Sequence, residues 1–223
     1  MADRVRVLVV DDHEMFGEAL SLLFERERDV ELLGRPSSVD RAIDLCRSRP
    51  PDVILIDVDM RNAGGIDGLT RLRRACPRAR VVVLTAPGNP ALVANALAAG
   101  ATGYVPKDRS LDELVDVVRR AAAGEIVMPT SDLARVFEHL RGRARVGPSD
   151  GFAIGRLTRR ETEILRALAE GRTTIEIADG LGISPLTVQS HVKSILAKLG
   201  VHSKIEAVTL AWRHGLAEAP HPS

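Results

Sequence analysis

The sequence predicts a doubly wound α/β domain with a five-stranded parallel sheet, followed by a small all-α domain of four helices. Two observations predict this division. Short aliphatic runs alternate with helical patterns through the first half of the chain, as in parallel sheets with right-handed crossovers. From Leu157 onward, apolar residues recur only at helical spacing. A length of 223 residues is sufficient for two domains with hydrophobic cores.

The composition indicates an ordinary globular protein, with 45% hydrophobic residues and a net charge of +1. The first residues, MADRVRVLVV, fit neither a signal peptide nor a membrane span, because the apolar run stops at two aspartates. We therefore expect a cytoplasmic protein without membrane contact. Cys46 and Cys76 have no metal-ligand spacing and no nearby histidine, so we expect structural thiols in a reducing compartment.

Five strands with intervening helices are predicted in the first domain. The strands cover Val5 to Val10, Glu31 to Arg35, Val53 to Ile56, Val81 to Leu84 and Thr102 to Val105. The helices cover Glu14 to Arg26, Val39 to Arg47, Leu69 to Ala75 and Leu92 to Ala99, with a last helix opened by the capping box Ser110-x-x-Glu113.

Polar side chains follow the strand ends: Asp11 and Asp12 after the first strand, Asp57 after the third, Thr85 after the fourth and Lys107 after the fifth. Open α/β sheets bind ligands at this edge, although a lone strand-end aspartate could equally be a helix cap or loop residue. Three carboxylates require a compensating cation, and hard oxygen ligands suit Mg²⁺. A carboxylate beside Mg²⁺ can attack a phosphoryl group and form an aspartyl-phosphate, with the Lys107 ammonium and the Thr85 hydroxyl stabilising the phosphoryl oxygens.

The pattern resembles the receiver domain of bacterial two-component response regulators, a flavodoxin-like fold. The matching strings are DDH at 11–13, D at 57, LTA at 84–86 and GYVPKD at 103–108. The resemblance implies that Asp57 is the phosphoacceptor and that Asp12 and Asp57 hold Mg²⁺, with Asp11 acting mainly through water and the backbone carbonyl of Asp59 completing the shell. It also implies a phosphate-pairing lysine and a switch pair, which are Lys107, and Thr85 with Tyr104.

The chain departs from the receiver pattern directly after the phosphoacceptor. Met60 is followed by RNAGGI, so the usual proline is missing and Asp67-Gly68 comes about three residues late. The lengthened loop from Arg61 to Ile66 borders the site and could alter Mg²⁺ affinity or phosphoryl lifetime. Pro87 and Pro90 predict a stiff loop after Thr85.

A phosphatase is an alternative, because DVDM at 57–60 also resembles the start of haloacid-dehalogenase-type phosphatases, with Asp57 as nucleophile and Asp59 as general acid. That family places this motif on its first strand and its other acidic motif far downstream. Here the acidic pair lies upstream, which favours the receiver.

The chain is divided as follows by its composition: a receiver domain over 1–123, a linker over 124–156, a helix-turn-helix domain over 157–217 and a tail over 218–223. The linker contains a predicted short helix from Asp132 to Leu140. Arg141 to Gly155 then has the Gly, Pro and Ser content of an exposed connector.

Four helices are predicted in the second domain, over 159–170, 174–181, 185–199 and 204–214. Their starts are marked by the capping boxes Thr158-x-x-Glu161, Thr173-x-x-Glu176 and Ser203-x-x-Glu206 and by Ser184-Pro185. The link Gly182-Ile183 is so short that it predicts a helix-turn-helix. In the third helix, the residues predicted to face inward are Val188, Val192, Ile195, Leu196 and Leu199, and those predicted to face outward are Gln189, Ser190, Lys193, Ser194 and Lys198.

The outward face suits the major groove of DNA, although the domain has a net charge near zero and its pattern alone leaves a helical protein-interaction module open. The segment from LTRRETEIL to KIEAV is similar to the LuxR-type helix-turn-helix of NarL/FixJ-class regulators. That resemblance implies a third helix that reads DNA and a fourth that forms a homodimer. The implied DNA-binding residues are Gln189, Ser190, Lys193, Lys198 and Lys204, and the implied dimerisation residues are Val201, Ala207, Val208 and Ala211.

Two departures from that family remove potential phosphate contacts: Thr174-Ile175 replaces the frequent Asn-Lys, and Gln189 replaces a basic residue. We therefore expect weak monomer affinity and reliance on dimerisation.

The expected function is a transcriptional regulator, not a metabolic enzyme. A sensor histidine kinase would phosphorylate Asp57, the face at Thr85 and Tyr104 would rearrange, and the helix-turn-helix would bind promoter DNA as a dimer. A DNA-binding regulator whose receiver acts independently of phosphorylation is the second alternative.

Overall fold

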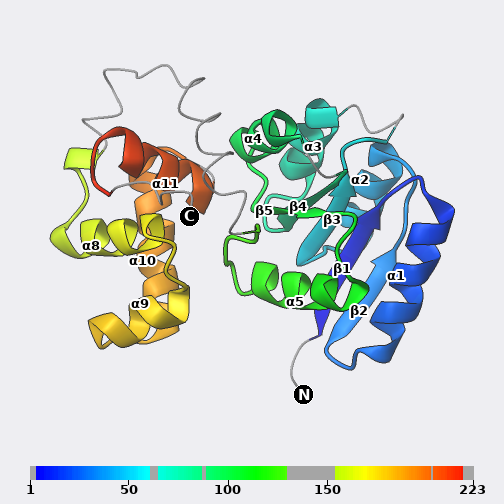
Figure 1. Ribbon diagram of the computed structural model, residues 1–223, viewed down its shortest axis with the longest axis horizontal. Helices are drawn as coiled ribbons and strands as arrows, with labels where there is room; N and C mark the ends of the chain where they lie inside the picture. Colours follow the sequence, from blue (N-terminus) through cyan, green and yellow to red (C-terminus); the bar gives the residue numbers. More distant parts are fainter. Residues whose placement is uncertain (1–3, 61–64, 87–88, 130–153, 202, 218–223) are drawn as a thin grey trace. The chain divides into compact units, whose positions relative to one another are not determined.

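The computed structural model of the chain describes residues 4–60, 65–86, 89–129, 154–201 and 203–217. The chain divides into two compact units, Met1–Met128 and Pro129–Ser223 (Figure 1). The short helix that the sequence predicts over 132–140 lies outside the described residues. Among the described residues, no helix has the length and apolar character needed to cross a membrane.

The first unit contains one parallel sheet with the strand order β2-β1-β3-β4-β5. Its strands are β1 (Val5–Val10), β2 (Val30–Gly34), β3 (Val53–Asp57), β4 (Arg80–Thr85) and β5 (Gly103–Pro106). All five residues of β3 are buried, as expected for an aliphatic strand at the centre of a parallel sheet. The strand order reverses between β1 and β3, where α/β sheets open a crevice at the strand ends.

Helices cover both faces of this sheet (Figure 1). One face carries α1 (Glu14–Arg26) and α5 (Leu111–Ala122), and the other carries α2 (Val39–Ser48), α3 (Gly65–Ala75) and α4 (Pro90–Ala98). One apolar cluster joins the sheet to α1 and α5. The helices contribute Leu20, Phe24, Leu114 and Val118 to it, and alternate strand residues contribute Val7, Val9, Val53 and Leu55. The predicted α/β fold is confirmed.

Two helices begin earlier than the sequence predicts. Helix α3 begins at Gly65, whose φ of 55° is favourable for glycine, and not at Leu69. Helix α4 begins at Pro90, and the side chain of Asn89 caps it by accepting a hydrogen bond from the Leu92 backbone N–H. Pro90 therefore opens a helix, where a proline costs no hydrogen bond, and Pro87 lies outside the described residues, so the predicted stiffness of this loop stays a prediction.

The second unit contains α8 (Arg159–Ala169), α9 (Thr174–Leu181), α10 (Pro185–Leu199) and α11 (Lys204–Arg213). Each helix starts at the predicted residue, because a Ser or Thr side chain at 158, 173, 184 and 203 accepts a hydrogen bond from a backbone N–H of the first turn. Both Thr158 and Thr173 form complete capping boxes with Glu161 and Glu176. The predicted four-helix domain is confirmed.

The two cysteines are free thiols that lie in the first unit. Cys46 on α2 and Cys76 after α3 are both buried. Burial raises the pKa of both thiols, so neither is poised as a thiolate. Their surroundings fit a role in packing.

Candidate functional site

Acidic side chains from β1 and β3 meet at the carboxyl edge of the sheet. The pairing of Val10 with Ile56 places the two strand ends next to each other. Asp57 is fully buried and the Asp11 side chain is 2% exposed, whereas 27% of the Asp12 side chain is exposed. The site is therefore closed on the protein side and open to solvent at Asp12.

Lys107 extends from the end of β5 into this acidic group. Its Nζ lies 2.7 Å from Oδ2 of Asp57 and 2.8 Å from Oδ2 of Asp11, and it lies 5.1 Å from the centre of the Phe16 ring. Burial lowers the pKa of Lys107, but hydrogen bonds to Asp11 and Asp57 outweigh it, and the pKa is raised above its ordinary value. The ammonium group is therefore charged at neutral pH and directed at Asp57.

His13 also belongs to this site, although the sequence does not predict it as a site residue. Its Nδ1 lies 3.0 Å from Oδ1 of Asp11, 3.3 Å from Oδ1 of Asp12 and 3.5 Å from Oδ2 of Asp57. The side chain is 63% exposed, so the imidazole lies on the side of the carboxylates that faces solvent. The available sequence signal is its position directly after Asp11-Asp12, where β1 passes into α1.

The donor set fits a hard divalent cation. One ligand atom each from Asp11, Asp12, His13 and Asp57 can be chosen so that all lie within 4.8 Å of one another. Three carboxylates face the single Lys107 ammonium, so negative charge is in excess. Carboxylate oxygens at such separations are the ligands that Mg²⁺ prefers.

Thr85 lies at the same edge, but its hydroxyl is bound to Asp59. Thr85 Oγ1 lies 3.2 Å from each of two acceptors, Oδ2 of Asp59 and the carbonyl oxygen of Ala86, and the Ala86 backbone N–H donates to the same Asp59 oxygen across 3.1 Å. The Asp59 backbone N–H in turn donates to Oδ1 of Asp57 across 2.9 Å. Asp59 therefore links the Asp57 loop to the end of β4 and holds the Thr85 hydroxyl.

Tyr104 and the lengthened loop complete the predicted features of this edge. Tyr104 on β5 is 4% exposed, and its backbone N–H donates to the carbonyl of Val127 across 2.8 Å. Residues 61–64, which form most of the lengthened loop, lie outside the described residues.

The second unit presents α10 as a two-sided helix. Val188, Val192, Ile195 and Leu199 are buried against the unit's other helices, and Leu196 is half-buried. On the other side Ser190 and Lys193 are exposed and Gln189 is half-buried. Between α9 and α10, Gly182 has a φ of 64°, a left-handed conformation that permits the tight turn.

Two residues predicted to face outward from α10 are instead bound to a buried carboxylate. Glu161 is 3% exposed, and it accepts hydrogen bonds from Ser194 Oγ across 2.6 Å, from Lys198 Nζ across 2.7 Å and from the Thr158 backbone N–H across 2.7 Å. Burial raises the pKa of Glu161, but these hydrogen bonds outweigh it and lower the pKa to about 2. The Lys198 ammonium must leave this partner before it could bind a phosphate.

Lys204 and the predicted dimerisation residues also contact other residues of the same unit. Lys204 Nζ lies 3.3 Å from Thr174 Oγ1. The predicted dimerisation residues do not form an open patch: Ala207, Val208 and Ala211 are buried, and Val201 is half-buried.

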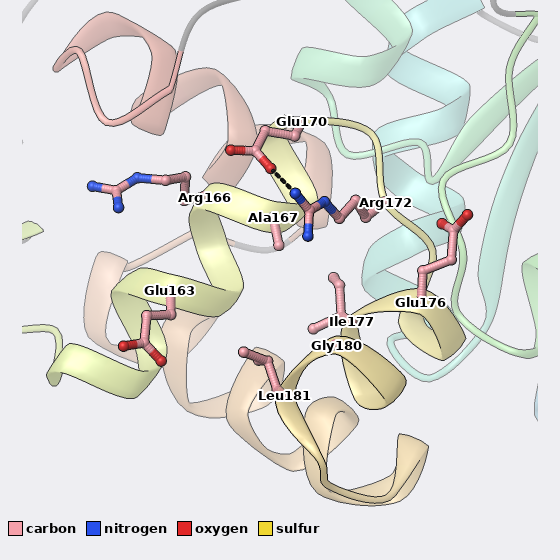
Figure 2. A pocket seen from close by; sticks show the side chains of 9 residues that line it. All are labelled: Glu163, Arg166, Ala167, Glu170, Arg172, Glu176, Ile177, Gly180 and Leu181. Carbon is pink, nitrogen blue, oxygen red and sulfur yellow. Dashed lines mark ion pairs between the residues drawn. The ribbon is translucent and has the colours of Figure 1, made fainter.

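A shallow pocket of roughly 200 Å³ lies between α8 and α9 (Figure 2). Its lining contains none of the predicted site residues. The charged groups around it have internal partners: Glu170 pairs with Arg172 at 3.0 Å, Glu163 pairs with Arg160 at 3.1 Å, and Arg166 donates to the carbonyl of Leu216. We interpret this pocket as a groove between packed helices.

Comparison with known proteins gives matches to both units. Residues 7–119 match the family model of the response regulator receiver domain, and residues 155–211 match that of the luxR family of bacterial regulatory proteins. The response regulator protein VraR of Staphylococcus aureus is 33% identical over 214 residues, which cover 96% of this chain and 99% of that protein.

The solved structures that are similar to this chain are also response regulators. RcsB of Salmonella typhimurium is 25% identical with a TM-score of 0.55, and the match covers 96% of this chain and 99% of that one. A structure of two RcsB dimers bound to two parallel DNAs has a TM-score of 0.56 at 25% identity, covering 95% and 98% of the two chains. The receiver domain of NarL from Mycobacterium tuberculosis is 32% identical with a TM-score of 0.52, covering 55% of this chain and 99% of that one.

Proposed function

The chain belongs to the two-component response regulators that join a receiver domain to a LuxR-type helix-turn-helix, and on this basis we propose that Asp57 is its phosphoacceptor. It is a transcriptional regulator of this family. One observation carries the assignment of Asp57: this carboxylate is fully buried at the end of β3, and the Lys107 ammonium lies 2.7 Å from it. A buried carboxylate facing a fixed ammonium is suited to accept a phosphoryl group.

The phosphoryl donor in this proposal is a phosphohistidine of a sensor kinase. An oxygen of Asp57 forms a bond to phosphorus while the bond from phosphorus to the histidine nitrogen breaks, and the nitrogen takes up a proton. The Asp59 N–H to Oδ1 and the Lys107 ammonium at Oδ2 fix the orientation of the attacking carboxylate. The same ammonium offsets negative charge on the phosphoryl oxygens. This chemistry is regulatory and not metabolic.

Mg²⁺ would be held by Asp12, Asp57 and the backbone carbonyl of Asp59, with Asp11 acting mainly through water, and when bound it supplies positive charge to the phosphoryl oxygens. The excess negative charge of the three carboxylates supports this assignment. The imidazole of His13 lies over the same carboxylates, so it must share their edge with the ion.

The switch in this proposal is an exchange of partners at Thr85. In the structure the Thr85 hydroxyl donates to Asp59. A phosphoryl group on Asp57 would offer stronger acceptor oxygens and would repel the Asp59 carboxylate, so the hydroxyl would turn from Asp59 to the phosphoryl group. Tyr104, on the neighbouring strand, would follow as the second member of the switch pair.

The output in this proposal is DNA binding by a homodimer, with α10 in the major groove of promoter DNA. Gln189, Ser190 and Lys193 would face base edges or nearby phosphates. Lys198 and Lys204 would become phosphate contacts only by leaving Glu161 and Thr174. The dimer seam would lie along α11 near Val201, Ala207, Val208 and Ala211, and would require rearrangement around the buried members of this group.

A small phosphodonor with Mg²⁺, followed by intact-mass measurement, tests the role of Asp57. We expect the full-length protein to gain one phosphoryl group and Asp57→Ala to gain none. Asp52→Asn is the matched control, because Asp52 directly precedes β3, at the end of the strand opposite to Asp57, and pairs with Arg6. The control should gain the group as the unmodified protein does.

Two other outcomes would each favour a different function. No mass gain together with intact DNA binding would identify a phosphorylation-independent regulator. Steady multi-turnover hydrolysis of phosphate esters that disappears in Asp59→Asn would identify a phosphatase.

A further inference from the structure

A leucine on the proposed recognition helix is largely exposed to solvent. Leu186, the second residue of α10, is 72% exposed. Among the residues that the structure describes, the large hydrophobic side chains that are exposed are Met15, Leu22, Ile175 and Leu186. Leu186 is therefore a rare case of apolar surface, and it lies on the element proposed to enter DNA.

Helix geometry places Leu186 on the same stripe as the proposed DNA contacts. Successive α-helical residues are about 100° apart, so residues at i, i+4, i+7 and i+11 lie along one face. For Leu186 these positions are Ser190, Lys193 and Ala197, and all four residues are exposed. The buried residues Val188, Val192, Ile195 and Leu199 lie on the opposite side. Leu186 thus continues the outward face to the helix N-terminus, which is the end that contacts base edges in helix-turn-helix proteins.

The backbone around Leu186 is fixed before any partner binds. Ser184 caps the helix by accepting a hydrogen bond from the Thr187 N–H across 3.1 Å, and Pro185 occupies the first helical position. Ser190 Oγ donates to the Leu186 carbonyl across 3.0 Å. The helix therefore sets the position of the Leu186 backbone before binding, and only the side-chain torsions of Leu186 have to be ordered when it meets a partner.

The chemistry of the side chain selects one feature of the major groove. Leucine can neither donate nor accept a hydrogen bond, so covering the amine of adenine or cytosine or an acceptor of guanine would leave polar groups without water. The 5-methyl group of thymine is the apolar group that the major groove offers. We propose that Leu186 contacts the 5-methyl group of a thymine and makes this chain prefer thymine at one position of each half-site. This inference rests on the proposed function of α10.

The test exchanges thymine for uracil, which lacks only the 5-methyl group. A duplex is first selected by the full-length protein from a randomised pool, and each thymine in it is then replaced by deoxyuridine in turn. At one position per half-site we expect the replacement to weaken binding roughly fourfold, the effect of removing one buried methyl group. Leu186→Ala should bind the thymine and uracil duplexes equally at that position.

Ile175→Ala is the matched control. Ile175 is also the second residue of its helix, α9, and is 58% exposed, but it lies outside the α10 stripe. This variant should keep the full difference between thymine and uracil. Unfolding followed by the fluorescence of Trp212, the single tryptophan, should be the same for Leu186→Ala as for the unmodified protein.

Three results would overturn the inference. Equal binding of thymine and uracil duplexes at every position by the unmodified protein would show that no methyl group is read. An undiminished difference in Leu186→Ala would assign the methyl contact to another residue. Failure of the full-length protein to select any duplex would remove the proposed DNA-binding function together with the role of Leu186.

Discussion

The carboxylate of Glu161 joins the first turn of α8 to the recognition helix. It accepts hydrogen bonds from the Thr158 N–H, the Ser194 hydroxyl and the Lys198 ammonium, and it is 3% exposed. A buried carboxylate is tolerated only when its oxygens are satisfied and its charge is paired. A single charged residue, which the sequence marks only as half of a capping box, therefore adds to the apolar packing that holds α10 against α8.

We predict that Glu161→Gln destabilises the second unit by about 2 kcal/mol at neutral pH, because the variant loses charge-assisted hydrogen bonds. The pKa of Glu161 is lowered from its ordinary value of 4.5 to about 2, so its ionised form is favoured by folding. The stabilisation is complete above pH 4.5 and is lost as pH falls toward 2. The difference in unfolding free energy between the unmodified protein and the variant should shrink over this range.

Urea unfolding at several pH values, followed by Trp212 fluorescence, measures this difference. Trp212 reports on the correct unit because its Nε1 donates to the carbonyl of Ala169 at the end of α8. Glu163→Gln, on the same helix but at the surface, should have a much smaller effect. A gap between Glu161→Gln and the unmodified protein that stays constant down to low pH would show that the charge of Glu161 is not its source.

At the scale of elements, sequence signals located helix ends best where caps are present. The helices of the second unit each follow a Ser or Thr cap, and α9 and α10 end at glycines with positive φ. The sequence places the start of α3 too late, because the adjacent glycines Gly64 and Gly65 indicate a loop, although Ile66 already fits the helical spacing of Leu69 and Leu72.

For the acidic site and for α10, the sequence likewise predicts the placement of residues better than their contacts. The alternation of strands and helices brings Asp11, Asp57 and Lys107 to one edge, since parallel strand ends must meet there. The bonds from Thr85 to Asp59 and from Lys198 to Glu161 could not be predicted, because they join residues 26 and 37 positions apart through side-chain geometry. Periodicity specifies which face a residue occupies, and it does not specify which partner that residue meets.

The turn between α9 and α10 gives a prediction at this scale. Gly182 has a φ of 64° and open space around it, so Gly182→Ala meets no steric contact but must adopt a left-handed conformation. We expect a loss of stability of about 1 kcal/mol. Gly180→Ala is the matched control, because Gly180 lies within α9 and is equally open. It should gain roughly 0.5–1 kcal/mol.

Unfolding midpoints in urea, read from Trp212 fluorescence, distinguish the two glycine variants. Opposite signs for Gly182→Ala and Gly180→Ala would attribute the effect to backbone conformation alone. Equal losses in both would show that the turn is not held in the left-handed region in solution.

At the scale of the whole molecule, phosphorylation of the first unit can control DNA binding by the second only if the binding equilibria of the two units are coupled. The proposed phosphoryl site lies within Met1–Met128 and the proposed recognition helix within Pro129–Ser223. Coupling between such sites is a free energy shared by both, so each ligand must change the affinity for the other by the same factor. That reciprocity allows the proposed function to be tested from either unit.

We predict that beryllium fluoride, a non-covalent phosphoryl mimic, raises the affinity of the full-length protein for its selected duplex by roughly 5- to 150-fold in the presence of Mg²⁺. The physical reason is that the mimic would draw the Thr85 hydroxyl from Asp59 and favour the form whose helix-turn-helix is free to pair on DNA. The duplex should raise the affinity for beryllium fluoride by the same factor, measured by titration calorimetry. Asp57→Ala should bind the duplex with one affinity whether or not the mimic is present. Identical duplex affinities for the unmodified protein with and without the mimic would mean that the units act independently, and the regulator would then not depend on phosphorylation.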